Sequence, residues 1–280
     1  MKITDWVGRT EEVTDIISAT PYAALSGLFD RSPERPPAGT PLPPLWHWLY
    51  FLSIHRRSEL APDGHAKRGG FIPPIALPRR MWAGSRFEFR RPLCVGDTLT
   101  RHSTILDVSE KEGRKGPLVF VRVLHEYLLT GESDPALVEF HDIVYRGKPL
   151  PGETAPGVKA PIEAPWEKNV VPDDVLLFRY SALTLNSHRI HYDWRYTTEH
   201  EGYPGLIVHG PLLATLLLEL LREHHPEAEL ADFEFRALRP LFAPHPFVLC
   251  GAPQADGKTV RLWVVDHEGN LGMEATASLR

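Results

Sequence analysis

The chain has little of what marks secreted, membrane-embedded or nucleic-acid-binding proteins. Only two of its 280 residues are cysteine, too few for a disulfide framework, which fits a reducing compartment. The N-terminus has no apolar run of signal-peptide length, and the longest apolar stretch, Leu212–Leu221, is too short to span a bilayer. The formal net charge is -5 and the Lys and Arg residues are scattered, which argues against a nucleic-acid surface. We therefore expect a cytoplasmic protein with no membrane or nucleic-acid partner.

The sequence has instead the composition and length of a globular protein with a sizeable core. Hydrophobic residues make up 42% and charged residues 24% of the chain, as in soluble globular proteins. A length of 280 residues allows one large domain or two of ordinary size. Composition alone leaves the number of domains open.

Three segments of the first half recur, in the same order, in the second half. The first is a four-residue identity, and the other two are pairs of strand-like segments. The pairs are Phe87-Glu88-Phe89-Arg90 with Phe233-Glu234-Phe235-Arg236, 119–123 with 260–265, and 137–146 with 273–280. Three ordered correspondences are hard to obtain by chance, so we infer a duplicated unit of strands.

A stretch with helical features precedes the strands in each half. Pro211–His224 follows a glycine, begins with a proline suited to the first helical position, and carries leucines on nearly every side. The aromatic-rich stretch Pro44–Ser58 takes the equivalent place in the first half. Before it, Glu11–Phe29 predicts a helical prelude, with Thr20 and Pro21 as cap and first position of its second helix. A long helix wrapped by antiparallel strands fits each half.

The repeat predicts two domains joined by a connection. Residues 148–166 are rich in Pro and Gly and read as the linker. The expected domains are therefore residues 1–147 and residues 167–280.

The side chains best suited to catalysis gather just before the second helix. Asn186, His188 and His191 place hydrogen-bonding and proton-transfer groups within six residues. Gly210 opens the helix that follows, and the first N–H groups of a helix can stabilise an oxyanion. A base that faces a helix N-terminus suits chemistry that passes through an oxyanion.

Each of these residues also has a structural alternative. His191 alone could be a core histidine, and Asn186 could cap a turn. A metal shared by His188, His191 and His209 is disfavoured, because no carboxylate or cysteine lies at ligand spacing in the motif. We favour catalytic roles for His191, Asn186 and Gly210, and we expect no metal.

The same residues resemble the hydratase motif of the MaoC-like dehydratase/hydratase family, which runs Asp-x-Asn-Pro-x-His. Asn186 stands where the family has its catalytic Asp, and His191 stands at the catalytic His. His188 and Arg189 take the places of the Asn and the Pro, and Gly210 matches the glycine that supplies the oxyanion-hole N–H. Asn cannot act as a general acid or base, so this departure changes the usual two-residue mechanism.

The first half is similar to the divergent N-terminal dehydratase domain that accompanies some MaoC domains. Its marks are the segments 42–46, 69–74, 79–84 and 116–120. The resemblance implies an α+β double hot-dog fold, in which two antiparallel sheets each wrap around a central helix. It also implies one active site per chain, in the second domain. No cofactor is expected, because coenzyme A is part of the substrate, and a homodimer is compatible with this fold.

The resemblance implies a hydro-lyase that adds water to an α,β-unsaturated acyl-CoA thioester. It narrows the acyl group to a branched C5 dicarboxylate, mesaconyl-C4-CoA or itaconyl-CoA, hydrated to citramalyl-CoA. The expected substrate-binding residues are His188, Arg189, Val208, His209, Arg79 and Arg80. A desolvated free carboxylate needs a cation or several donors, and Arg79, Arg80, Arg86, Arg189 and His188 are the candidates.

Two other functions remain open at this stage. A 3-hydroxyacyl-thioester dehydratase of fatty-acid metabolism would use the same catalytic residues in the reverse direction. A non-catalytic acyl-CoA-binding protein is the alternative of another class. The aromatic residues Trp46, Trp48, Trp82 and Phe71 could line a channel for the substrate, although core packing is their default role.

Overall fold

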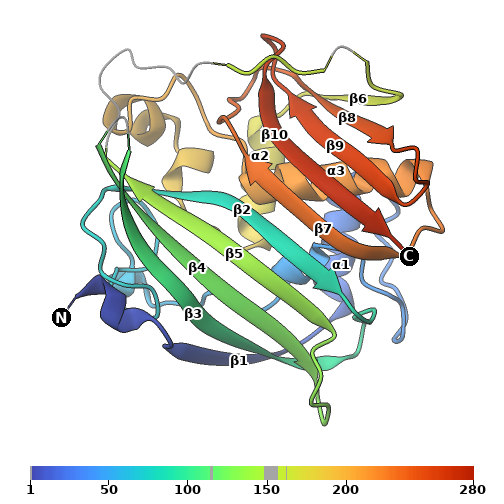
Figure 1. Ribbon diagram of the computed structural model, residues 1–280, viewed down its shortest axis with the longest axis horizontal. Coiled ribbons are helices and arrows are strands. Elements are labelled where there is room, and N and C mark those ends of the chain that lie inside the picture. The colour runs from blue at the N-terminus through green and yellow to red at the C-terminus, as the bar shows by residue number, and fades with distance from the viewer. Residues whose placement is uncertain (1, 114–115, 148–156, 162) are drawn as a thin grey trace.

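A single antiparallel sheet forms the framework of the protein (Figure 1). The computed structural model describes residues 2–113, 116–147, 157–161 and 163–280. Within them ten strands pair in the order β1-β3-β4-β5-β2-β7-β10-β9-β8-β6. The strands of the first half are β1 (Thr10–Ile16), β2 (Arg79–Phe89), β3 (Thr98–Gly113), β4 (Gly116–Leu129) and β5 (Leu137–Arg146). Those of the second half are β6 (Trp166–Val170), β7 (Leu230–Ala237), β8 (Phe247–Pro253), β9 (Thr259–Val265) and β10 (Leu271–Leu279).

The inferred duplication is visible in the strand order. From the centre outwards the first half runs β2, β5, β4, β3, β1, and the second runs β7, β10, β9, β8, β6. The two copies of the repeated tetrapeptide lie side by side, with Phe87 paired to Phe233. The predicted double hot-dog fold with two antiparallel sheets is confirmed, and the structure joins the two sheets edge to edge. Pairing of β2 with β7 merges them, which leaves neither central strand with an open edge.

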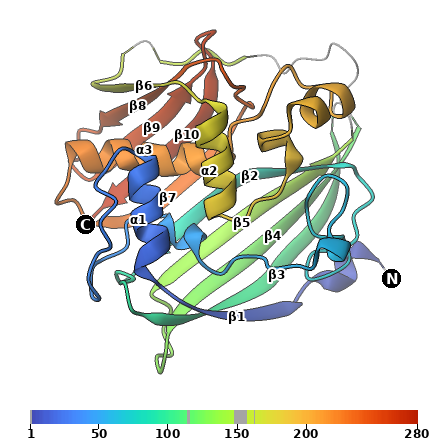
Figure 2. The same ribbon diagram turned by 180° about the vertical axis from the view of Figure 1, so that it is seen from behind.

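The helix of the second half is the one that the leucine pattern predicted. Helix α3 spans Gly210–His224 and buries every residue from Leu212 to Leu221. It lies on the same face of the sheet as α1 (Ala19–Leu28) and α2 (Asp174–Leu183), as Figure 2 shows from behind. This is the central helix of a hot-dog fold, and its first residue is Gly210.

The predicted helix Pro44–Ser58 of the first half is wrong. The structure has only a 3-10 turn at Trp46–Leu49 and another at Arg57–Glu59. Leu45 and Phe51 on either side of the first turn have φ of 68° and 54°, and an α-helix does not continue through left-handed residues. The aromatic side chains that suggested a helix are instead packed around a short irregular segment.

The helical prelude is also only partly correct. Its first part is strand β1, which pairs along its whole length with β3 at the sheet edge. Its second part is helix α1 (Ala19–Leu28), whose N-cap is Ser18 rather than Thr20. Pro21 falls at the third helical position, where its missing N–H costs no intrahelical bond. The predicted N-cap, Thr20, thus lies two residues from the observed N-cap, Ser18.

Of the predicted linker 148–166, residues 148–156 and 162 lie outside the described residues. The boundaries 1–147 and 167–280 stay predictions. Among the described residues, no helix combines the length and apolar character that crossing a bilayer would need.

Candidate active site

The motif lies on a sharp turn after helix α2 (Asp174–Leu183). Leu185 has a φ of 48°, and the Asn186 N–H donates to the Ser181 carbonyl at 2.8 Å, which ends the helix and redirects the chain. The chain then enters a 3-10 turn, Arg189–His191. The turn brings His191 under the segment that leads into α3, because the Ile207 N–H donates to the carbonyl of Ile190 at 2.9 Å.

His191 is a buried and oriented imidazole. Its Nδ1 lies 2.8 Å from the carbonyl oxygen of Ile207, and its side chain is 8% exposed. A carbonyl only accepts, so Nδ1 carries the hydrogen and Nε2 keeps a lone pair in the neutral ring. Burial lowers the pKa of His191 to about 4, and this effect outweighs the hydrogen bond to the Ile207 carbonyl, which raises the pKa. The ring is therefore a neutral base at pH 7, held in one tautomer.

This protonation state predicts the pH profile. We expect kcat/KM for crotonyl-CoA to stay level from pH 8 to about 5, and to fall about tenfold per pH unit below a midpoint near 4. The sign follows from the base, which is active when neutral and lost as pH falls through its pKa. The measurement is a rate profile with circular dichroism at each pH to confirm that the protein is folded. A midpoint at or above the usual pKa of histidine would contradict this assignment.

The imidazole ring of His209 stacks on the ring of His191. The two rings stack with centroids 3.7 Å apart and planes 18° from parallel. His209 is 0% exposed, its Nε2 lies 2.8 Å from the Ser181 hydroxyl, and its Nδ1 has no partner among the described residues. Val208 is buried as well. The side chains of both of these predicted substrate-binding residues are therefore buried, and the Val208 N–H donates to the Leu241 carbonyl at 2.9 Å.

Gly210 has an unused backbone donor beside this base. It is the first residue of α3, with His209 as N-cap and Pro211 next, so its N–H has no intrahelical acceptor. No described residue accepts from it. A Cβ at Gly210 would meet nothing within 4 Å, so open space adjoins this position. His209 stacks on His191, which places the Gly210 donor and the base within one small region.

A cavity of about 170 Å³ lies beside Asn186 and Pro211 and is lined by residues of both halves. His191 and Gly210 are not among its lining residues. Asn186 and Pro211 line it together with Tyr180 and Thr184 from the second half, and Trp48 and Trp82 come from the first. Trp46 is buried in the hydrophobic core, and Phe71 packs against a second core cluster. Sequence reasoning missed Tyr180 and Thr184, although both lie within six residues of the motif.

Asn186 caps the turn through its side-chain oxygen and also lines the cavity. Its Oδ1 accepts from the His188 N–H at 3.1 Å, which is the turn-capping alternative. Its Nδ2 donates to no described residue, and the side chain lines the cavity beside Pro211. The capping bond thus orients the amide so that its other end can hold a water or a substrate atom.

Replacing this amide by a carboxylate tests its role. We expect Asn186→Asp to keep the turn, since a carboxylate also accepts from the His188 N–H, but to lower kcat/KM by ~10-fold and change the pH profile. The reasons are a lost N–H donor and a new negative charge beside the base. The measurement is kcat/KM against pH for the variant and the wild type. Equal or higher activity would mean that the site accepts an ordinary Asp/His pair.

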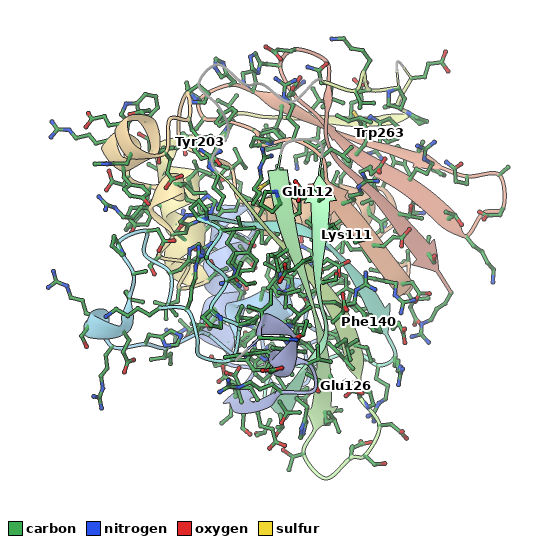
Figure 3. All side chains as sticks on the ribbon, turned by 60° about the vertical axis from the view of Figure 1, so that its left-hand side comes forward. Lys111, Glu112, Glu126, Phe140, Tyr203 and Trp263 are labelled. Carbon is green, nitrogen blue, oxygen red and sulfur yellow. The ribbon has the colours of Figure 1, made fainter. Side chains whose placement is uncertain are left out.

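The predicted arginines have different environments. Arg79 forms an ion pair with Glu201, in which Arg79 Nε lies 3.6 Å from Glu201 Oε2, and its guanidinium also donates a hydrogen bond to the Glu201 backbone carbonyl. The Arg79 guanidinium lies 4.3 Å from the centre of the Tyr203 ring. Arg189 pairs with Asp193 at 2.7 Å and stacks on Tyr196. Figure 3 shows Tyr203 among the coil segments, on the other side of the strands from Phe140 and Trp263. Arg79 and Arg189 are therefore already engaged within the protein.

Arg86 lies on the far face of the sheet, which excludes it from the site. Its guanidinium stacks on Phe140 at 4.4 Å, and both line an open groove of about 1030 Å³ that also borders Trp263. None of the motif residues lines this groove. The prediction that Arg86 could meet the substrate carboxylate is wrong, because its side chain points to the opposite face of β2 from Trp82 and the cavity.

Arg80 is the remaining predicted arginine, and it is half-buried. Beside the motif the structure also brings in Asp63 and His65, which sequence reasoning missed. The carboxylate and ring nitrogens of Asp63, His65 and His188 all lie within 4.8 Å of one another, a set that could ligate a metal. No sequence signal marked them, since they are separated from the motif by more than a hundred residues.

Comparison with known proteins decides the family. The profile of the hydroxyacyl-thioester dehydratase type 2 family matches residues 45–243. The chain belongs to this family. A relative, mesaconyl-C(4)-CoA hydratase of Chloroflexus aurantiacus, is 45% identical over 276 residues, which cover 98% of this chain and 96% of the relative. The resemblance to hydratases and dehydratases inferred from the motif is thereby confirmed, and with it the assignment as an enzyme of the hydro-lyase class.

Solved structures confirm the fold. HtdX of Mycobacterium tuberculosis is similar with a TM-score of 0.65 at 16% identity, over 96% of this chain and 99% of that one. A second M. tuberculosis protein, which has a double hotdog fold, is similar with a TM-score of 0.58 at 14% identity, over 98% and 96% of the two chains. At such identities these likenesses support the double hot-dog architecture only.

Proposed function

We propose that the protein hydrates a branched C5 dicarboxylyl-CoA, mesaconyl-C4-CoA or itaconyl-CoA, to citramalyl-CoA. The observation that carries the chemistry is the neutral, oriented His191 next to the unused N–H of Gly210. The named substrate rests on the 45% identity to a mesaconyl-C(4)-CoA hydratase. Coenzyme A belongs to the substrate, and no separate cofactor is needed.

The reaction follows from the placement of these groups. With mesaconyl-C4-CoA, whose double bond is conjugated with the thioester, a water held by His191 Nε2 and the Asn186 amide loses a proton to His191 as its oxygen attacks the β-carbon. The electron pair of the double bond moves to the thioester oxygen, which the Gly210 N–H stabilises. The enolate then takes the proton from His191 at the α-carbon, so one water is added and the base is restored.

The dehydratase of fatty-acid metabolism is the second candidate, and the name of the matching family favours it. It uses the same residues in reverse, so only the acyl end separates the two. We also propose a cytoplasmic location, and a homodimer remains a further hypothesis. A non-catalytic acyl-CoA-binding role is disfavoured by the tautomer and burial of His191.

The deciding experiment is an absorbance assay of the purified protein with enoyl-CoA substrates that do or do not carry a free carboxylate. We expect mesaconyl-C4-CoA or itaconyl-CoA to be hydrated with a higher kcat/KM than crotonyl-CoA. A preference for crotonyl-CoA would make the fatty-acyl dehydratase the better assignment. No turnover of any substrate would favour the binding protein.

A further inference from the structure

The cavity of about 170 Å³ is connected to the proposed catalytic groups through three of its lining residues. Asn186 itself lines it, and so does Pro211, the residue that follows Gly210. Tyr180 lines it as well, and the centroid of its ring lies 5.0 Å from that of His209, whose ring stacks on the proposed base. An acyl group bound at these catalytic groups therefore has this cavity beside it.

Two tryptophans of the first half form part of the cavity lining. Trp48 lies in the 3-10 turn that follows the left-handed Leu45, and Trp82 lies on β2. The centroids of the two indole rings are 5.1 Å apart, and the ring planes make an angle of 66°. Both side chains are half-buried and pack against the hydrophobic core. The two indoles therefore form one continuous apolar wall of the cavity.

A buried carboxylate fixes the position of Trp48. Trp48 Nε1 donates to Glu139 Oε1 at 3.4 Å, and Glu139 is only 2% exposed. The other oxygen of this carboxylate, Oε2, accepts from the Tyr127 hydroxyl at 3.0 Å and lies 3.3 Å from His47 Nε2. Leaving a buried polar group unpaired is costly, so such a network favours a single arrangement. The Trp48 ring would have to break a hydrogen bond of this network in order to move aside.

Hydrogen bonds and stacking fix Trp82 as well. Its Nε1 donates to Ser85 Oγ at 2.9 Å and to the Gly84 carbonyl at 3.1 Å. The centroid of its ring lies 4.0 Å from that of His141, with the two planes 30° apart. Buried indole N–H groups need a partner, and this one has two. Both indoles of the wall are therefore held in place by the fold of the first half.

The volume of the cavity limits the acyl group that fits. A dry cavity of ~150 Å³ in a protein core holds a benzene molecule, with about six carbon atoms. A cavity of about 170 Å³ thus has room for about as many non-hydrogen atoms. In mesaconyl-C4-CoA the part beyond the thioester carbonyl is of this size: the two carbons of the double bond, the methyl group and the carboxylate. A fatty acyl chain such as decenoyl is larger, and forcing extra methylenes against a fixed wall is unfavourable.

We propose that Trp48 and Trp82 set the upper limit of acyl length, so that the site takes short acyl-CoA thioesters and excludes fatty acyl chains. This inference rests on the proposed function and names the residues that separate a C5 hydratase from a dehydratase of fatty-acid metabolism. The first half, which carries none of the proposed catalytic residues, thereby acts in substrate selection. A longer chain would need the space that the two indoles occupy.

The test compares the wild type with Trp82→Leu, Trp82→Ala and the control Trp263→Leu. Trp263 is a buried tryptophan that lines the groove on the far face of the sheet, so its variant loses the same side-chain volume away from the cavity. The measurement is the ratio of kcat/KM for crotonyl-CoA to kcat/KM for decenoyl-CoA. Neither substrate carries a free carboxylate, and a ratio cancels any loss of folded protein.

We expect a ratio of at least ~30-fold in the wild type, because a single excess methylene in a fixed apolar pocket already costs ~10-fold or more. Trp82→Leu should narrow the ratio by ~3-fold and Trp82→Ala by ~10-fold, in the order of the space that each variant opens. Trp263→Leu should leave the ratio unchanged. The milder leucine variant keeps the test decisive if Trp82→Ala does not fold.

Binding of saturated acyl-CoA esters tests the wall without the reaction. Butyryl-CoA and decanoyl-CoA cannot be hydrated, so their Kd values do not depend on the catalytic step. We expect the wild type to bind decanoyl-CoA no more tightly than butyryl-CoA. Trp82→Ala should bind decanoyl-CoA ~10-fold more tightly than the wild type does, since the opened cavity buries more of the apolar chain.

The outcomes separate this inference from the proposed function. A wild type that uses decenoyl-CoA as well as crotonyl-CoA would overturn the length limit, and so would an unchanged ratio in both Trp82 variants. Equal narrowing of the ratio in Trp263→Leu would also overturn it, because selection would then depend on packing in general. A wild type that excludes decenoyl-CoA but prefers crotonyl-CoA to mesaconyl-C4-CoA would refute the proposed substrate and leave the length limit intact.

Discussion

Replacing His191 with alanine should lower kcat/KM by at least ~100-fold, since loss of a general base typically costs this much. His191 is the proposed base of the site. Its Nδ1 lies 2.8 Å from the Ile207 carbonyl oxygen, which leaves the lone pair on Nε2. The ring also stacks on His209 at 3.7 Å, so alanine removes packing as well as chemistry. The measurements are kcat/KM with mesaconyl-C4-CoA and crotonyl-CoA, and the melting temperature.

The matched control for this variant is His191→Asn. An asparagine amide can still donate to the Ile207 carbonyl, as Nδ1 does, but it has no counterpart of the Nε2 base. We expect His191→Asn to lose as much activity as His191→Ala while it keeps a melting temperature closer to that of the wild type. Near-normal turnover in either variant would rule out His191 as the base. Retained activity in the Asn variant alone would give His191 a purely structural role.

Replacing Gly210 with proline should lower kcat/KM by ~100-fold or more, because it removes the backbone donor that we propose stabilises the thioester oxygen. One oxyanion donor is worth on the order of 3 kcal/mol. Proline suits the first position of a helix, and the preceding His209 has φ of -62° and ψ of 131°, which a following proline accepts. The helix should therefore form, and the effect should fall on kcat rather than on the melting temperature.

Gly210→Ala separates the lost N–H from the added side chain. A Cβ at this position meets nothing within 4 Å in the protein, and alanine keeps the N–H. We expect Gly210→Ala to cost less than ~10-fold, so that the difference between the two variants reports the donor. If both variants lost activity equally, the open space at Gly210 and not its N–H would be what the reaction requires.

The strength of the sequence pattern explains which elements could be predicted. Helix α3 buries ten consecutive residues, and its leucines and Pro211 are local signals that need no knowledge of the rest of the chain. The segment Pro44–Ser58 is as apolar, but the left-handed residues Leu45 and Phe51 interrupt it. Apolar content without a helical period cannot distinguish a helix from a packed irregular segment. Tertiary packing decided this region.

The edge strand β1 was missed for a related reason. It is short and largely exposed, and its pairing partner β3 begins more than eighty residues later. Its stability comes from that partner and not from its own side chains. Propensity within the segment therefore could not reveal it.

The sequence by itself determined the repeat, the helix that opens at Gly210, and the motif with Asn186 and His191. These depend on neighbours within a few residues or on similarity between two segments. Only the tertiary structure decided that Asp63 and His65 lie against His188, and that Arg79 and Arg189 are engaged in contacts within the protein. The loop that carries Asp63 and His65 reaches the motif across 123 residues, as from Gly64 to Ser187. Such contacts depend on the register between the two halves, which is set by the pairing of β2 with β7 and leaves no local trace in either segment.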